Sequence, residues 1–103
     1  IANPSYATVF GPNSLAEAPI AAVLEDGRVV AGTVDRMLVG DDVVRVVDYK
    51  TGMQVPASES EVPAAHRRQM EAYVSALKVI FPGRRVEAAL LYTSGPKIIP
   101  LAG

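Results

Sequence analysis

Two valine-rich segments lie in the middle of the chain and are separated by only three residues. Val29–Val39 and Val43–Tyr49 are rich in branched side chains, which favour strands, and Gly40-Asp41-Asp42 joins them. A connection this short joins antiparallel neighbours. Upstream, the apolar segment Ala16–Leu24 predicts another strand, and Glu25-Asp26-Gly27-Arg28 predicts a hairpin turn with glycine at positive φ. We therefore predict a three-stranded antiparallel meander.

The second half of the chain predicts one long helix and two further strands. Pro63 begins a segment with apolar residues at helical spacing that continues to Ile80, and Pro82-Gly83 ends it. Val86–Thr93 and Lys97–Leu101 predict strands. Because the helix connects the third strand to the fourth, we expect these two strands to be parallel.

The remaining segments complete the predicted fold. Asn3 and Pro4 predict the start of a short helix over Pro4–Phe10. Residues 51–62 have neither helical nor strand periodicity, which predicts a mobile loop. A chain of 103 residues has the size of one domain. The predicted fold class is α/β (α+β), with a mixed central sheet that contains the antiparallel meander, one long helix and a short N-terminal helix.

The composition excludes several classes of protein. The chain has no cysteine, so it cannot be a disulfide scaffold, hold a thiolate metal site or use a cysteine nucleophile. No apolar run reaches the ~18–20 residues of a membrane span, and the N-terminus lacks the layout of a signal peptide. We expect a soluble intracellular domain. Because the first residue is Ile1 and not methionine, we also expect it to be part of a longer protein.

The charges are distributed unevenly, although the net charge is only −1. Residues 1–60 hold four basic and eight acidic side chains, whereas residues 61–103 hold six basic and three acidic ones. Scatter over a solvated surface explains this bias. An acidic site beside a basic ledge also explains it, and a metal-dependent enzyme that acts on a polyanion would need such a site.

Two carboxylates, Asp35 and Asp48, interrupt apolar rows of the predicted meander. By strand alternation, the row of Asp35 also holds Val29, Ala31, Thr33, Met37 and Val39, and the row of Asp48 and Lys50 holds Val44 and Val46. A buried carboxylate without a partner is strongly disfavoured. A salt bridge to Lys50, Arg36 or Arg45 would explain either carboxylate taken alone.

The two carboxylates together indicate a metal site. A meander that turns at residues 40–42 places Asp35 and Asp48 side by side or one register step apart, where they repel each other unless a cation lies between them. Oxygen ligands suit a hard ion, Mg²⁺ or Mn²⁺. Lys50 points to the same side, where its ammonium can stabilise charge that develops on a phosphate. One cation and one lysine in this arrangement predict a phosphodiesterase site.

Three motifs occur in order along the chain: Gly32-x-x-Asp35-Arg36, then Asp48-Tyr49-Lys50-Thr51-Gly52, then Gln69-x-x-x-Tyr73. This pattern resembles the RecB-type branch of the PD-(D/E)XK nuclease superfamily, and within it the C-terminal nuclease domain of the AddA-type helicase–nucleases. The resemblance covers roughly residues 16 to 93. It implies a restriction-endonuclease-like core, with residues 1–103 as the C-terminal part of a nuclease domain.

The resemblance assigns roles to individual residues. Asp35 and Asp48 would be metal ligands, with the carbonyl of Tyr49 as a further ligand, and Lys50 would be the catalytic lysine. Together, Asp35, Asp48 and Lys50 form the expected catalytic set. The expected cofactor is Mg²⁺, with Mn²⁺ as the alternative.

Other residues have less specific implied roles. Gln69 and Tyr73 would contact DNA or orient the site; core packing is the alternative for Tyr73 and a solvated helix position for Gln69. Arg36 would steady Asp35 or meet phosphate. Glu17 would be an outer or second-metal carboxylate, or a surface residue. His66 is the one histidine of the chain, and we interpret it as a solvated or phosphate-facing residue.

The resemblance further implies a Mg²⁺-dependent deoxyribonuclease, an exonuclease or endonuclease, that processes double-strand breaks for recombinational repair. Its expected partners are DNA, ATP-binding helicase domains of the same polypeptide and an AddB-like second subunit, without membrane association. The expected location is the bacterial cytoplasm, at the nucleoid, and the isolated fragment is expected to be inactive. A non-catalytic DNA-binding or subunit-docking domain with the same fold, and a small β-rich interaction module, are the alternatives.

Overall fold

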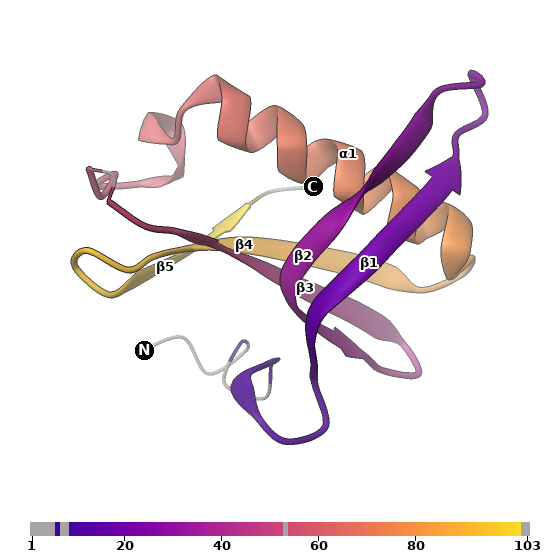
Figure 1. The fold of residues 1–103 in the computed structure, drawn as a ribbon, viewed down its shortest axis with the longest axis horizontal. Coiled ribbons are helices and arrows are strands. Elements are labelled where there is room, and N and C mark those ends of the chain that lie inside the picture. Colours follow the sequence, from indigo (N-terminus) through magenta and orange to yellow (C-terminus); the bar gives the residue numbers. More distant parts are fainter. Residues whose placement is uncertain (1–5, 7–8, 53, 102–103) are drawn as a thin grey trace.

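A computed structural model describes residue 6 and residues 9–52 and 54–101. One sheet contains five strands in chain order: β1 (Leu15–Val23), β2 (Val29–Val39), β3 (Val43–Lys50), β4 (Arg85–Tyr92) and β5 (Lys97–Leu101). A short 3-10 helix, η2 (Glu59–Glu61), and the long helix α1 (Ala64–Ile80) connect β3 to β4 (Figure 1). Only β3 and β4 are parallel; the other neighbours are antiparallel. The predicted meander, long helix and parallel pair are confirmed.

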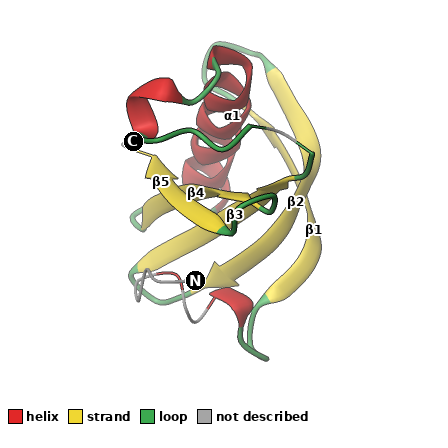
Figure 2. Ribbon diagram, turned by 90° about the vertical axis from the view of Figure 1, so that its left-hand side faces the viewer, coloured by secondary structure: helices red, strands yellow, loops and turns green. Residues whose placement is uncertain are grey.

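The sheet separates two hydrophobic clusters. Figure 2 shows α1 on one side of the sheet, and the larger cluster fills the space between them, with Val46 and Leu90 completely buried. On the other face, Tyr6 and Val9 pack against Val47. The predicted N-terminal helix lies largely outside the described residues; those that are described, at positions 6, 9 and 10, have 3-10 geometry.

Helix α1 forms because its apolar residues recur on one face. Its buried side chains are Met70, Tyr73, Ala76 and Leu77, which are spaced by three, three and one residues. Pro63 occupies the position before the first turn, where its missing N–H costs nothing. Within the described residues, no helix is long and apolar enough to cross a membrane.

Close packing between α1 and β2 explains why a glycine stands at position 32. A Cβ atom on Gly32 would lie 2.9 Å from Cε1 and 3.0 Å from Cζ of Tyr73, closer than real side chains approach. Tyr73 is 8% exposed and belongs to the larger core cluster. The glycine of the first motif and the tyrosine of the third are therefore in direct contact, and the tyrosine ring lies against bare backbone.

Strand β2 departs from regular alternation at Asp35. Val34 and Met37 both pack into the helix-side cluster although they are three residues apart, which a regular strand does not allow. The prediction that Asp35 shares a buried apolar row is therefore wrong for the first half of β2. The side chains in that half of the row are exposed: Val29, Ala31 and Thr33.

The backbone of the neighbouring strand is also irregular at this level. Glu17 lies between the pairs Ala16↔Arg36 and Ala18↔Val34, and so opposite Asp35. Its φ of 50° is the one positive value at a non-glycine residue in the described part of the chain. A glutamate in this region is uncommon and mildly strained. The irregularity of β1 and β2 is thus confined to the level of the carboxylate pair.

Side chains from β5 and α1 anchor Pro56, Ala57 and Glu59, in the segment for which the sequence predicts a mobile loop. The ammonium of Lys97 donates to the carbonyl oxygens of Pro56 and Ala57 at 3.1 and 2.6 Å. The guanidinium of Arg67 donates to the carboxylate of Glu59 at 3.2 Å and also to its backbone carbonyl. Sequence periodicity could not reveal these anchors, because their donors lie on β5 and α1.

We predict that Gly32→Ala lowers the free energy of unfolding by ~1–3 kcal/mol, the usual cost of overpacking a core. The cause is the clash with the Tyr73 ring, so combining Gly32→Ala with Tyr73→Leu should recover part of the loss. Denaturant unfolding of both variants measures this. Gly95→Ala is the matched control, since its Cβ would meet Val55 Cγ2 at an ordinary 3.4 Å. Equal stability of Gly32→Ala and Gly95→Ala would contradict the packing argument.

Candidate active site

At the point where β2 and β3 stop pairing, two carboxylates accept hydrogen bonds from the backbone in place of carbonyl groups. The last backbone pair on this side is Arg36↔Val47, and Asp35 and Asp48 are the next residues outward. The N–H of Asp35 donates to Asp48 Oδ1 at 3.3 Å, and the N–H of Tyr49 donates to Asp35 Oδ2 at 2.7 Å. Each strand therefore places its carboxylate on the backbone of the other, which brings the two acidic groups together.

Asp48 carries a buried carboxyl group whose pKa is strongly perturbed. It is 7% exposed and is the one charged side chain that is buried in the described part of the chain. Burial, followed by the hydrogen bond and charge of Asp35, raises its pKa from 3.8 to about 6, and the nearby charge of Lys50 opposes the rise. The surroundings of Asp48 therefore disfavour its ionised form. A cation at this position would stabilise that form.

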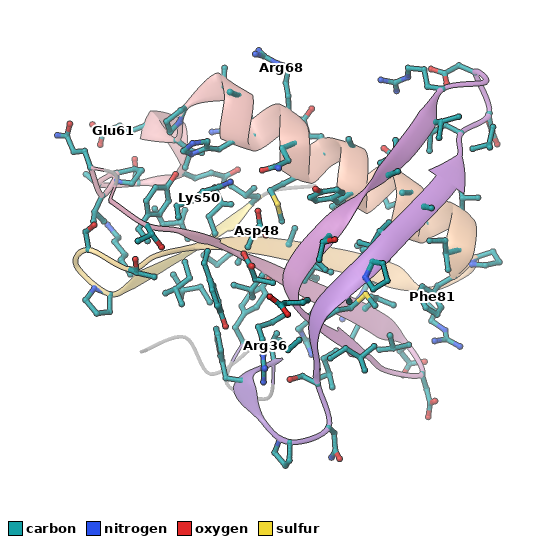
Figure 3. All side chains as sticks on the ribbon, viewed as in Figure 1. Arg36, Asp48, Lys50, Glu61, Arg68 and Phe81 are labelled. Atoms are coloured by element: carbon teal, nitrogen blue, oxygen red, sulfur yellow. The ribbon has the colours of Figure 1, made fainter. Side chains whose placement is uncertain are left out.

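Lys50 extends from the end of β3 toward helix α1. Its Nζ lies 3.4 Å from Asp48 Oδ2 and donates to Gln69 Oε1 at 2.9 Å. In Figure 3, the side chains of Lys50 and Asp48 lie on the side of the sheet that faces α1. The strand end and the helix together hold one ammonium beside the carboxylate pair, as the predicted site requires.

The structure adds a residue that the sequence did not single out. Tyr92 ends β4, is the register partner of Lys50, and is completely buried. Its hydroxyl lies 3.0 Å from Nδ1 of His66, and the two rings are tilted with centroids 6.1 Å apart. His66 is thus half-buried and hydrogen-bonded, not simply solvated. The parallel pairing of β3 with β4 was the signal that could have placed Tyr92 beside Lys50.

Arg36 does not reach the carboxylate pair. It lies on the opposite side of the sheet from Lys50 (Figure 3), and its guanidinium donates to Ser14 Oγ at 2.8 Å and to the carbonyls of Val9 and Gly11. These bonds fasten the segment before β1 to the sheet. The side chain of Arg36 is therefore engaged in holding this segment, which accounts for its position on the far face.

Of the other predicted residues, Tyr49 contributes to the site only through its backbone. Its ring faces the far side and stacks on Phe10, with centroids 6.4 Å apart and planes 10° from parallel. Tyr73 packs in the core under Gly32, as the alternative interpretation had it. Glu17 is exposed on the edge strand, opposite Asp35.

The donor set fits a hard divalent cation with incomplete protein coordination. Asp35 and Asp48 supply carboxylate oxygens from neighbouring strands, and Mg²⁺ characteristically binds through one or two carboxylates while keeping several waters. In the described part of the chain, no group of three or more histidine, cysteine, aspartate or glutamate side chains is placed to hold a metal ion. Among the described residues, the pair would therefore supply the only carboxylate ligands of a cation held here, and binding would be weak.

We predict that Asp48 lowers stability as pH rises from about 4 to about 6. Because its folded pKa is about 6 and its ordinary value 3.8, the folded state keeps a proton in this window that the unfolded state loses. Below the window this preference stabilises the fold fully, and above it the stabilisation is gone. Urea unfolding without divalent cations should show that Asp48→Asn removes this slope.

The control for this prediction is Asp26→Asn. Hydrogen bonds from the backbone and side chain of Arg28 lower the pKa of Asp26, which is exposed, so its contribution to the pH dependence has the opposite sign. Asp26→Asn should leave the slope due to Asp48 in place. A wild-type slope in Asp48→Asn would show that this carboxyl does not titrate as described.

Comparison with known proteins assigns the chain to a family. The profile of the PD-(D/E)XK nuclease superfamily matches residues 6–99, which include both carboxylates, the lysine and the whole of α1. A search of the curated proteins found no match. The mixed five-stranded sheet with one long helix is consistent with a restriction-endonuclease-like core. The match spans most of the chain, and the chain belongs to the PD-(D/E)XK nuclease superfamily.

Proposed function

We propose that this chain is the metal-dependent deoxyribonuclease core of an AddA-type helicase–nuclease that processes broken DNA ends. One observation carries the proposal: Asp35 and Asp48 meet where the pairing of β2 with β3 stops, and the ammonium of Lys50 lies 3.4 Å from Asp48 Oδ2. Membership of the superfamily supports nuclease chemistry on a nucleic acid. The order and spacing of the three sequence motifs support the narrower, AddA-type assignment.

In this proposal Asp35 and Asp48 hold Mg²⁺ or Mn²⁺, and the carbonyl of Tyr49 is available as a further ligand. When bound, the cation supplies Lewis-acid chemistry for phosphodiester hydrolysis. Lys50 stabilises the negative charge that develops on the phosphate, because its ammonium lies on the same side as the carboxylates. Burial strengthens both effects, since Asp48 and Lys50 are largely withdrawn from water.

Gln69 positions the lysine. Its Oε1 accepts a hydrogen bond from Lys50 Nζ at 2.9 Å, and the same ammonium lies 3.4 Å from Asp48 Oδ2. The amide group of Gln69 is exposed at the helix surface, where its NH₂ is free to donate to a phosphate oxygen. Gln69 would therefore link the lysine to the DNA backbone.

The remaining parts of the proposal concern the larger assembly. The DNA duplex would be supplied by ATP-driven helicase domains of the same polypeptide, and an AddB-like subunit would complete the complex. Recombinational repair in the bacterial cytoplasm, at the nucleoid, is the corresponding role. These partners follow from the AddA-type resemblance of the motifs, and the geometry of the site is compatible with them.

We predict that Lys50→Ala in the full-length protein abolishes DNA cleavage while leaving DNA binding and ATP hydrolysis largely unchanged. A single ammonium matters at the transition state, where it can contribute several orders of magnitude in rate, but it adds little to a large phosphate-contact surface. Cleavage of linear duplex and single-stranded DNA with Mg²⁺ measures the effect. Lys78→Ala, which removes an exposed lysine on α1, is the matched control and should cleave normally.

Two outcomes would contradict the proposal in different ways. Near-normal cleavage by Lys50→Ala removes the lysine from the mechanism. A wild-type protein that binds DNA but never cleaves it, with Mg²⁺ or Mn²⁺ present, would identify a non-catalytic DNA-binding or subunit-docking domain.

We further predict that residues 1–103 alone have little or no nuclease activity. Two carboxylates and a carbonyl are few ligands for Mg²⁺, so the isolated fragment should hold the ion weakly. The fragment can be assayed on linear duplex and single-stranded DNA with Mg²⁺ or Mn²⁺, beside its Lys50→Ala variant. Robust degradation that depends on Lys50 would show that the site is complete within these residues.

A further inference from the structure

Next to the proposed site lies a hydrogen-bonded pair that the mechanism above does not use, His66 and Tyr92. Tyr92 is completely buried and is the register partner of Lys50 in the parallel β3–β4 pair. A buried hydroxyl needs a hydrogen-bond partner, and Nδ1 of His66 lies 3.0 Å from the oxygen. The sheet therefore fixes Tyr92, and Tyr92 fixes the imidazole ring.

This contact favours one tautomer of the imidazole. Within the described residues, Nδ1 of His66 is the one hydrogen-bond partner of the buried Tyr92 hydroxyl, and we therefore assign the hydroxyl as the donor and Nδ1 as the acceptor. Burial raises the pKa of Tyr92, which keeps that hydrogen on the oxygen. Burial and then the charge of Lys50 lower the pKa of the imidazole, which favours its neutral form. Its single ring hydrogen consequently stands on Nε2.

The Nε2 atom of His66 is available to a ligand. It has no hydrogen-bond partner among the described residues, yet no buried side-chain nitrogen or oxygen there lacks a partner. The atom is therefore open to solvent. It also lies on the side of the ring away from Tyr92, since Nδ1 is the nitrogen that faces the phenol.

The ring lies near Lys50 and Gln69 of the proposed site. His66 precedes Gln69 by three residues on α1, so the two side chains are neighbours on one helix face. Gln69 contacts the ammonium of Lys50 at 2.9 Å, and Lys50 is near enough to influence His66 electrostatically. A nucleic-acid backbone that reaches Lys50 would therefore pass the Gln69 amide and the His66 ring together.

We propose that His66 is a substrate-contacting residue, which donates from Nε2 to a non-bridging oxygen of a nucleic-acid phosphate while Tyr92 holds the ring through Nδ1. The inference rests on the proposed function and deepens it by naming a further contact to the DNA backbone. Because the donor is neutral, it orients a phosphate beside the Lys50 ammonium without adding a second positive charge there.

Two substitutions separate this role from a purely structural one. In His66→Asn the amide replaces Nδ1, so Tyr92 keeps a partner but the outer donor is lost. In His66→Gln the longer amide reaches the position of Nε2, so the donor remains while Tyr92 loses its partner. Full-length proteins carrying each change would be compared in steady-state cleavage of a single-stranded oligodeoxynucleotide, in its binding by fluorescence anisotropy in EDTA, and in thermal unfolding.

We expect His66→Asn to lower kcat/KM for cleavage about ten-fold, the size expected for one hydrogen bond to a charged group, because the phosphate beside Lys50 loses one orienting contact. The Kd in EDTA should stay near that of the wild type, since one contact adds little to a large phosphate-contact surface. His66→Gln should keep kcat/KM near that of the wild type while lowering the melting temperature. Unchanged kcat/KM in His66→Asn, or a loss confined to His66→Gln, would overturn the inference. Lys50→Ala is assayed in parallel: wild-type cleavage that does not depend on Lys50 overturns the proposed function itself.

Discussion

The exchange of carboxylates between β2 and β3 is the interaction on which the rest of the site depends. Beyond Arg36 and Val47 the two strands no longer pair through backbone groups, and Asp35 accepts the N–H of Tyr49 while Asp48 accepts the N–H of Asp35. These bonds satisfy backbone N–H groups that would otherwise lack a partner where β2 and β3 stop pairing. They also bring two acidic groups together, and burial, followed by the hydrogen bond and charge of Asp35, raises the pKa of Asp48 to about 6.

The side chains next to the two carboxylates carry a positive charge or none. The ammonium of Lys50 lies beside Asp48 and donates to Gln69, and the neighbouring hydrogen-bonded pair, Tyr92 and His66, favours the neutral state. A cation between the carboxylates and a phosphate beside the lysine would each relieve an unbalanced charge. In the proposed nuclease, the unbalanced charges that lower the stability of the free protein would favour binding. The carboxylate pair would favour the metal, and Lys50 would favour the DNA backbone.

Much of the fold was predictable because it follows from local rules. Valine-rich segments with short turns specify antiparallel pairs, and a helix between two strands specifies a parallel one. The carboxylate pair was predictable for the same reason, since the turn at residues 40–42 sets the register. Alternation failed at Asp35, where β2 is irregular opposite the positive φ of Glu17, and no periodicity argument detects such a break.

The sequence by itself determined the antiparallel meander, the parallel pairing of β3 with β4, the helical face of α1 and the meeting of Asp35 with Asp48. These features follow from short turns, from a helix that connects two strands and from helical spacing. Only the tertiary structure decided that Arg36 binds the segment before β1, that Tyr73 lies against Gly32 and that Tyr92 orients His66. Those contacts join residues 22 to 41 positions apart, and their geometry arises only when α1 and the N-terminal segment pack on opposite faces of the sheet.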